Sequence, residues 1–247
     1  MSGLRVNLVW LVIFALTLPL SVVFSTNLAR HSFEKVRLRD QTIHVKGYAE
    51  RRITSDYALW TTQVQATGVD LKLAYATLSA GRERVLAYLK QNGFADEKVN
   101  IGPVDITTLH PRDAKGNELN AVEGYRVSQG FWVDSPDVKL IDRTARQSGD
   151  LIRDGIELQA SRPQFLYTKL DGLKLQMLSE ASENARARAE VLIGKSSGRL
   201  GSLRSAAQGI FQITPPLSTT VADEGLNDTS SIDKVIKAVV NLEFAIE

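Results

Sequence analysis

The chain has 247 residues, 43% of them hydrophobic, a formal net charge of +2, and no cysteine. A charge this balanced gives no electrostatic basis for a nucleic-acid partner. The missing cysteine excludes a disulfide framework, a thiol nucleophile and a thiolate metal site. Roughly 200 residues follow the first forty, which is enough for one sizeable core or two closely packed lobes.

The N-terminal segment carries no charged residue between Arg5 and Arg30. A helix over the 19 residues Val6–Phe24 would be roughly 28 Å long, about one hydrocarbon core of a bilayer. Trp10 lies near one end, where an aromatic ring can rest among lipid headgroups. We therefore expect residues 1–29 to form a retained membrane anchor. The side chains expected to contact lipid are Leu8, Val9, Trp10, Leu11, Val12, Ile13, Phe14, Leu16, Leu18, Val22, Val23 and Phe24.

The same segment also fits a cleavable signal peptide, with Arg5 as its basic region, Leu8–Leu18 as its apolar region and a cleavage site at Val23–Ser25. That site lacks the alanines of a strong signal, and the apolar run is long, so the anchor is the favoured alternative. Residues 30–41 form a charged stalk. Its basic residues oppose an outward-facing body under the positive-inside rule, although long domains often translocate despite such charges.

The first part of the body alternates apolar and polar residues at 42–49 and 57–68, which predicts two half-buried strands. Residues 54–56 supply a turn, so we expect the two strands to pair as a hairpin. From residue 71 the apolar spacing becomes three to four, which predicts an amphipathic helix over 71–92 that ends at Gly93. Its inward residues are expected to be Leu71, Tyr75, Leu78, Val85 and Leu89.

Further strands are predicted at 99–109 and 125–134, with a polar connector over 110–123 between them. The triplet Ser135-Pro136-Asp137 predicts a helix start, with the serine as cap, proline at the first helical position and the acid near the helix dipole. We expect this helix to run without interruption to about Asp154.

The second half of the body begins with an extended segment over 156–168, followed by the longest helix over 171–195. That helix has an inward stripe that narrows to alanines, allowing a neighbour to approach closely: Leu173, Met177, Leu178, Ala181, Ala185 and Ala189. Residues 200–214 predict a strand pair or bent strand, 214–231 a breaker-rich loop, and 236–246 a strand near the centre of a sheet.

Together these elements predict an α+β fold, with strand hairpins and amphipathic helices packed on an antiparallel or mixed sheet. One N-terminal transmembrane or signal helix precedes this body.

Motifs that suggest chemistry are sparse. Gly194-Lys195-Ser196 ends like a phosphate-binding loop, but Ala189 replaces the first required glycine and the triplet closes a helix instead of opening one. His31, His44 and His110 have no second histidine or acid at metal-ligand spacing. His44 is the one best placed to titrate. We therefore expect no catalytic, cofactor-binding or metal-binding residue, and no cofactor.

Two other polar or aromatic groups have ordinary structural explanations. Glu183 and Arg186 are spaced for a modest ion pair on a solvated helix face. Trp60, Phe131 and Trp132 lie on predicted strands, where core or interface packing accounts for them without a stacking platform.

Four stretches carry a family resemblance: 45–68, which begins VKGYAE; GYRVSQGFWVD at 124–134; ASENARARAEVLIGKSSGRLGSL at 181–203; and the closing VIKAVVNLEFAIE. In this order and spacing, residues 42–247 resemble the SIMPL-domain family of bacterial envelope proteins, which includes the periplasmic immunogenic proteins. The resemblance implies one exported α+β domain that is prone to ring- or cage-like homo-oligomeric assembly. It implies no established cofactor or catalytic residue.

The leading hypothesis is a non-enzymatic protein of the bacterial inner membrane, single-pass, with its body in the periplasm and assembled into a homo-oligomer. Cleavage of the signal would leave a soluble periplasmic protein instead. One alternative function is a binding module for a small ligand or envelope polymer, using the 110–123 and 214–231 loops. The other is an unrecognised hydrolase, for which His44→Ala is the discriminating variant. The sequence identifies no small-molecule ligand.

Overall fold

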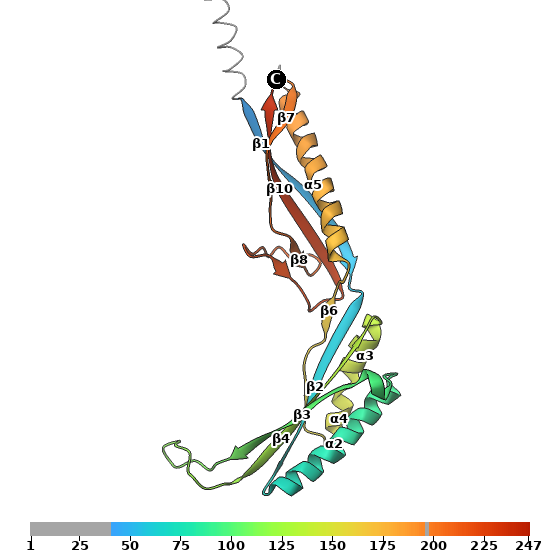
Figure 1. The fold of residues 1–247 in the computed structure, drawn as a ribbon, viewed down its shortest axis with the longest axis vertical. Coiled ribbons are helices and arrows are strands. Elements are labelled where there is room, and N and C mark those ends of the chain that lie inside the picture. Colours follow the sequence, from blue (N-terminus) through green and yellow to red (C-terminus); the bar gives the residue numbers. More distant parts are fainter. Residues whose placement is uncertain (1–40, 196–197) are drawn as a thin grey trace, which may run out of the picture. The chain divides into compact units, whose positions relative to one another are not determined.

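The computed structural model describes residues 41–195 and 198–247, and the expected anchor lies outside this range. The chain divides into two compact units. In the described range, unit 1 comprises residues 41–49, Leu175–Ile210 and Ala238–Glu247, and unit 2 comprises Glu50–Lys174 and Phe211–Lys237. The two long strands β1 (Thr42–Thr54) and β10 (Asp233–Ile246) contribute to both units (Figure 1).

The sheet of unit 1 has the C-terminal strand at its centre, as predicted. The Ile246 N–H donates to the Gln41 carbonyl at 2.9 Å, which joins the end of β10 to the start of β1. Strand β7 (Leu200–Gln208) pairs antiparallel with β10 over the register Val240–Gln208 to Ile246–Leu200. Because Ile246 has a partner in both strands, β1 and β7 lie on opposite sides of β10.

Helix α5 (Leu170–Ile193) packs on this sheet along its alanine stripe. Met177, Ala181, Ala185 and Ala189 are fully buried, which confirms the predicted stripe. The stripe lies against Gly47 of β1, where an added methyl group would lie 1.9 Å from the Ala181 carbonyl oxygen. It would also lie 2.7 Å from the Ala185 Cβ. The close approach therefore depends on a residue without a side chain in the strand.

Unit 2 is built on a second sheet with strand order β3-β4-β2-β5, and β6 also pairs with β2. All its pairings are antiparallel. Helices cover one face of this sheet and pack against its core residues, including Trp60, Val64 and Phe131. The elements are β2 (Tyr57–Gly68), α2 (Leu71–Gln91), the short 3-10 helix η1 (Asp96–Lys98), β3 (Asn100–Leu109), β4 (Gly124–Ser135), α3 (Val138–Gln147), α4 (Gly149–Arg153), β5 (Leu158–Ala160) and β6 (Gln164–Leu166).

The remaining strands of unit 2 are short. Strand β8 (Gln212–Thr214) pairs antiparallel with the start of β10, and β9 (Leu226–Asn227) pairs parallel with β8. The described residues thus form an α+β fold of mostly antiparallel sheets, which confirms the predicted class.

The predicted hairpin between the first two strands is wrong, because β1 and β2 belong to different sheets. The backbone between them is held by other segments: the Ser55 N–H donates to the Ile232 carbonyl and the Asp56 N–H to the Leu166 carbonyl, both at 2.9 Å. Alternation predicted each strand and its buried face correctly. It carries no information about which strand lies beside which.

Two helix predictions also need correction. The segment after Pro136 forms two helices, α3 and α4, separated at Ser148. The cap is Asp137, whose carboxylate accepts from the Leu140 N–H at 3.0 Å, while the Ser135 hydroxyl accepts from the Asp137 N–H. An acid one residue after proline can cap as well as a serine before it, and sequence alone does not distinguish them.

In α2 the predicted inward positions Leu78, Val85 and Leu89 are confirmed, but Leu71 and Tyr75 are exposed. The buried stripe instead begins at Ala74 and passes through Gly81. Small residues there let the helix lie close to β2, since a methyl group at Gly81 would lie 2.9 Å from Val64 Cγ1. The prediction placed the large residues Leu71 and Tyr75 inward at the start of this helix, whereas the small residue Ala74 is the buried one.

The contact at Gly47 predicts a strongly destabilising substitution. Gly47→Ala should lower the free energy of unfolding by about 3 kcal/mol or more, because the methyl group meets backbone atoms that cannot move aside. Gly130→Ala, on β4, is the matched strand control because nothing lies within 4 Å of its added methyl. That control should be neutral or stabilising by up to about 1 kcal/mol. Urea unfolding followed by circular dichroism measures both, and equal effects would contradict the close contact.

Candidate functional site

The predicted anchor side chains, from Leu8 to Phe24, lie outside the described residues. Within the described residues, no helix is long and apolar enough to span a bilayer. Helix α5 ends at Ile193, and Gly194 and Lys195 follow it. The triplet that begins at Gly194 therefore follows a helix end, as expected, and does not have the helix-start geometry of a phosphate-binding loop.

The two described histidines lie apart from each other in the fold. His110 Nδ1 lies 2.9 Å from the Ala121 carbonyl oxygen. His44 is exposed on β1, with its Nε2 3.5 Å from Glu243 Oε1. Among residues 41–195 and 198–247, no three histidine or acid side chains are grouped so that they could hold a metal ion.

A hollow of about 280 Å³ on the sheet of unit 1 is lined by His44, Ser205 and Glu243 among others. These residue types could suggest a hydrolytic triad, in which the histidine must lie between the nucleophile and the acid. Here Glu243 on the central strand is directly opposite Ser205 on β7, and His44 is on β1 at the other side. The acid occupies the middle position, so the hollow does not have the order that nucleophilic catalysis requires.

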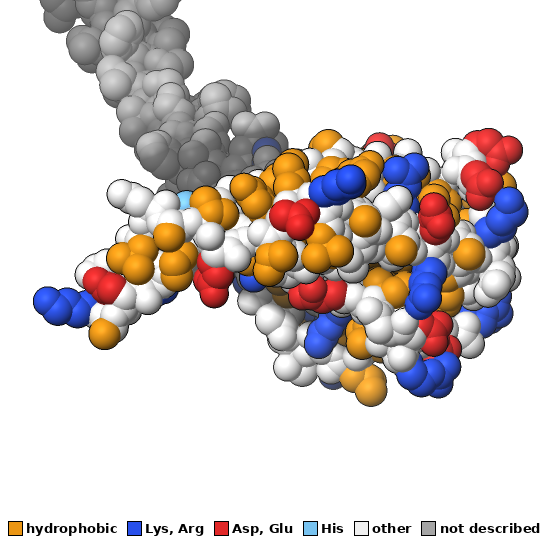
Figure 2. Space-filling view, turned by 90° about the horizontal axis from the view of Figure 1, so that it is seen from below, with side chains coloured by type: hydrophobic (Ala, Val, Ile, Leu, Met, Phe, Trp, Pro, Cys, Tyr) orange, Lys and Arg blue, Asp and Glu red, His pale blue; other side chains and the backbone are white. Residues whose placement is uncertain are grey.

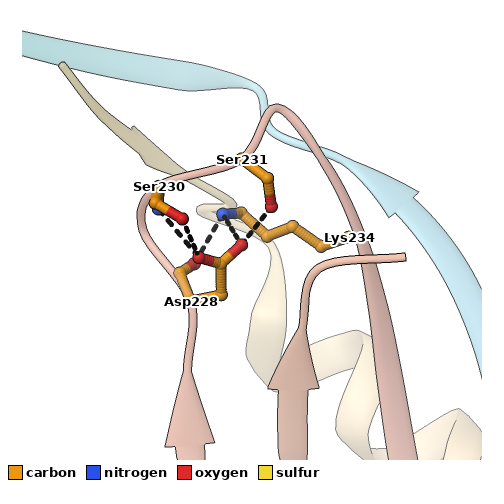
Figure 3. Close-up of polar contacts among 4 residues, drawn as sticks. All are labelled: Asp228, Ser230, Ser231 and Lys234. Atoms are coloured by element: carbon orange, nitrogen blue, oxygen red, sulfur yellow. Dashed lines mark hydrogen bonds and ion pairs between the residues drawn. The ribbon is translucent and has the colours of Figure 1, made fainter. Parts of the chain in front are cut away.

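Unit 2 contains a buried charged cluster centred on Asp228 and Lys234 (Figure 3). The Lys234 ammonium lies 3.2 Å from Asp228 Oδ2 and also donates to the Asp228 carbonyl oxygen. The two side chains are only 2% and 9% exposed. Ser230 donates to the same carboxylate from its N–H and its hydroxyl, and Ser231 donates from its hydroxyl.

The electrostatics of this cluster favour a structural role. Burial raises the pKa of Asp228, but hydrogen bonds from Ser230 and Ser231 and the charge of Lys234 outweigh it and bring that pKa to about 2. Burial lowers the pKa of Lys234, an effect that Asp228 partly offsets. Nearly every polar atom of the pair is engaged and hidden from solvent. The cluster therefore fixes the 215–232 segment to β10 and offers no access to a substrate.

Sequence reasoning missed this cluster, although a signal was present. The alternation that places Ile236 and Ala238 inward also places Lys234 inward, and a lysine in phase with buried residues requires a partner. The partner Asp228 lies in a loop whose composition suggested only irregular structure.

The two loops considered for ligand binding differ in structure. The 215–232 loop is pinned by the buried pair, whereas the 110–123 connector forms the tip of the β3–β4 arm. At that tip charged and apolar side chains lie next to one another (Figure 2). Leu119 and Val122 are 46% and 53% exposed, and Arg112 pairs with Glu118 at 3.1 Å. The hollows at His44–Glu243, Asn184–Leu192 and Arg84–Asp154 are lined by no residue of either loop.

The outer edge of β1 is covered by α5. The Asn184 side-chain oxygen accepts from the Tyr48 N–H at 3.1 Å, and Arg188 donates to the Lys46 carbonyl oxygen at 3.2 Å. Backbone groups that would otherwise be open to another strand are thereby satisfied. On the solvated face of the same helix, the expected pair of Glu183 with Arg186 is not formed. Arg186 pairs instead with Glu190 at 3.1 Å, since four residues along the helix is an equally good spacing.

Strand β7 is an exposed edge. Within the described residues only β10 pairs with it, and every residue from Ser202 to Gln208 is exposed. Arg204 is its one charged residue. Edge strands are usually protected by lysines, prolines or bulges, because their free N–H and C=O groups are a template for another chain. Strand β7 contains no lysine or proline, but two register shifts against β10, one on each side of Phe244, interrupt the half that contains Arg204. Its regular half, Ser205–Gln208, is an open edge and is the candidate interaction site.

Strand β3 is the other long edge and is better protected. It contains Pro103 and a register shift between Ile101 and Val104 against β4. The regular part, Val104–Leu109, pairs only with β4 among the described residues, and Ile106 there is 55% exposed. Pro103 and the register shift restrict the template that this edge offers to Val104–Leu109.

Comparison with known proteins identifies one family. Residues 43–244 match the SIMPL family, described as "Protein of unknown function (DUF541)". No curated protein matches the chain. One similar solved structure is titled "Crystal structure of an uncharacterized conserved protein from Listeria innocua", with 8% identity over 77% of this chain and 91% of that chain. Its TM-score of 0.18 is too low to support any argument.

The buried pair predicts a large cost for removing one partner. Asp228→Asn should lower the free energy of unfolding by about 3–5 kcal/mol, because the buried Lys234 ammonium loses its counter-charge. Adding Lys234→Met to that variant should recover much of the loss. Asp150→Asn, which breaks the exposed pair with Arg153, is the control and should cost less than about 1 kcal/mol. Urea unfolding of the four proteins measures these differences. Equal costs for Asp228→Asn and Asp150→Asn would contradict the burial argument.

The pair also predicts a window of acid sensitivity. The pKa of Asp228 falls from an ordinary 3.8 to about 2 on folding. The ionised carboxylate therefore stabilises the fold above about pH 4, and this contribution, on the order of 2 kcal/mol, is lost as pH falls toward 2. Unfolding measured from pH 5 to pH 2 should show the gap between wild type and Asp228→Asn shrinking by that amount. A gap independent of pH would show that the charge of Asp228 does not stabilise the fold.

Proposed function

Since this chain belongs to the SIMPL family, whose function is unknown, we propose that it is a non-enzymatic envelope protein that self-assembles into a homo-oligomer. It is tethered to the bacterial inner membrane by one span, and its body faces the periplasm. The open edge of β7 at Ser205–Gln208 is the single observation that carries the self-assembly.

The two outer edges of the sheet of unit 1, those of β1 and β7, differ in how they are covered. The edge of β1 is covered by two side chains of α5, whereas the outer edge of β7, on the other side of β10, is open. The small side chains Ser205, Ala206 and Ala207 in the regular half of β7 let a second strand approach there. Main-chain hydrogen bonds then supply affinity without a dedicated apolar interface.

The geometry of assembly follows from which edges pair. Pairing β7 of one copy with β7 of another is a two-fold contact and stops at a dimer. Pairing β7 with the regular part of β3 of the next copy is heterologous, and it gives a closed ring where the rotation from copy to copy closes and an open filament where it does not. We favour the ring, because it uses both open edges and leaves neither exposed.

A tether supports assembly by raising local concentration. The described chain begins at Gln41, beside the end of β10, so the preceding part of the chain enters unit 1 at Gln41. Copies held on one membrane meet in two dimensions, and a weak edge contact then suffices to hold an oligomer.

Charged side chains on β7 should break the assembly. The double variant Leu203→Lys/Ala206→Lys should reduce the native mass to the monomer, because lysine on an edge opposes strand pairing. Native mass spectrometry of the detergent-solubilised full chain measures this. Leu175→Lys, at an equally exposed apolar position of α5 (71% exposed), is the control and should leave the mass unchanged.

Ile106→Lys on β3 distinguishes the β7–β3 ring from the β7–β7 dimer. In the ring it also yields smaller species, whereas in a β7–β7 dimer it has no effect. A wild-type protein that is monomeric at all concentrations would overturn the proposal of self-assembly.

A further inference from the structure

Trp132 lies outside the core, so of the two explanations that the sequence prediction gave, core packing is wrong and interface packing stays a prediction. Along β4, the neighbours Phe131 and Val133 are 0% and 1% exposed and face the helices of unit 2. Trp132 points to the opposite face of the sheet and is 39% exposed. The second strand tryptophan, Trp60, is 1% exposed, so burial is available to a tryptophan in this unit. Trp132 is the one placed on the uncovered face.

Two glycines leave the surroundings of this indole open. Gly130 lies two residues earlier on the same face of β4, and an added methyl group there would meet nothing within 4 Å. On the neighbouring strand, a methyl group at Gly102 would lie 3.6 Å from Trp132 Cζ3 and 3.5 Å from the Gly130 carbonyl oxygen. The edge of the indole thus lies beside bare backbone. On that side of the indole the backbone of Gly102 and Gly130 forms a shallow floor, and no side chain fills the space.

The groups around this floor are polar but uncharged. Thr61 and Asn100 are directly opposite Trp132 on the two flanking strands, and Gln63 is opposite Gly130. The Gln63 amide donates to the Ser128 hydroxyl at 3.0 Å, which holds both side chains in place. A second amide bridge, from Gln159 to Gln65 at 3.0 Å, continues the polar face.

The nearest charges on this face lie farther out. Asp134 follows Trp132 by two residues and accepts from the Tyr57 hydroxyl, and Arg126 lies beyond Ser128. Glu157 also accepts from Gln65 at the far side of the amide bridge. Asp105 on β3 is exposed and directly opposite Ser128, while no charged residue is directly opposite Trp132 or Gly130 on either flanking strand.

We propose that this surface, defined as Trp132 with Gly102, Gly130, Gln63, Thr61 and Asn100, binds a neutral glycan chain. The flat face of a sugar ring presents C–H groups with partial positive charge, which complement the electron-rich face of an indole. The equatorial hydroxyls of the same ring point outward, where amide and hydroxyl side chains can both donate and accept. A floor of uncharged groups matches a neutral polyhydroxyl ligand, and the acids farther out, Asp105, Asp134 and Glu157, oppose phosphorylated or sulfated polymers.

The proposal is independent of self-assembly. It uses the open face of the sheet in unit 2, while the proposed assembly uses strand edges. A variant can therefore lose glycan binding and keep its oligomeric mass, or the reverse.

The test is calorimetric titration of the detergent-solubilised full chain with neutral hexasaccharides of β-1,4-linked N-acetylglucosamine and of β-1,4-linked glucose. Wild type should bind at least one of them. Trp132→Ala should weaken binding at least tenfold, and Trp132→Phe should retain part of it. Tyr75→Ala removes an aromatic ring that is 51% exposed on α2 and should leave binding unchanged.

Gly130→Val tests glycan binding by the same surface while Trp132 is retained. The open space around Gly130 accepts the side chain, so the thermal midpoint should be unchanged or raised, yet the filled floor should abolish binding. Three results would overturn the proposal: no binding of either hexasaccharide by wild type, equal binding by Trp132→Ala, or preferential binding of an anionic heparin hexasaccharide. Loss of oligomeric mass in Trp132→Ala, without any glycan binding by wild type, would assign the surface to a second copy of the chain instead.

Discussion

The contact between Gly47 and the Ala181–Ala185 segment of α5 decides how the outer edge of β1 in unit 1 is covered. Only a residue without a side chain allows the helix to lie this close to β1. At this distance Asn184 and Arg188 reach the backbone of β1 and satisfy its outer edge. One side of the sheet is thereby closed to other chains, while β7 on the other side remains open. The asymmetry that underlies the proposed assembly therefore follows from a single small residue.

In unit 2 a buried ion pair, and not a close backbone contact, fixes a segment of the chain. The 215–232 segment carries only the two-residue strand β9. The buried pair of Asp228 and Lys234 adds directional contacts there. Removing two charges from water is costly, and such a pair is a weak source of net stability. Its value lies in specificity, because only one arrangement of the segment satisfies both charges. A loop of mostly small polar residues thus acquires a defined path beside β10.

The residue pattern predicted the local structure well and the long-range structure poorly. Alternation identified β2, β4 and β10 and the buried face of each, because burial on one face of a strand has a period of two. It did not identify the partners of β1, since strand pairing depends on segments nearly 200 residues away. The phase of Lys234 already indicated a buried cation, but its partner lay in an aperiodic loop. Trp132 was likewise out of phase with the core. Its exposure depends on helices covering only one face of the sheet, which no local pattern encodes.

The hydrogen bond between Ile246 and Gln41 also has a consequence for the timing of folding. The central strand of unit 1 comes last among the described strands in the chain, and its neighbour β1 comes first. Closing such a distant pair costs chain entropy before any contact compensates for it, so the step is slow relative to helix formation. Neither β1 nor β7 has its sheet partner until the last residues are available. Under the proposed export, a chain threaded across a membrane would complete this sheet only after its C-terminus had arrived, and the unpaired strands would be most exposed to wrong partners until then.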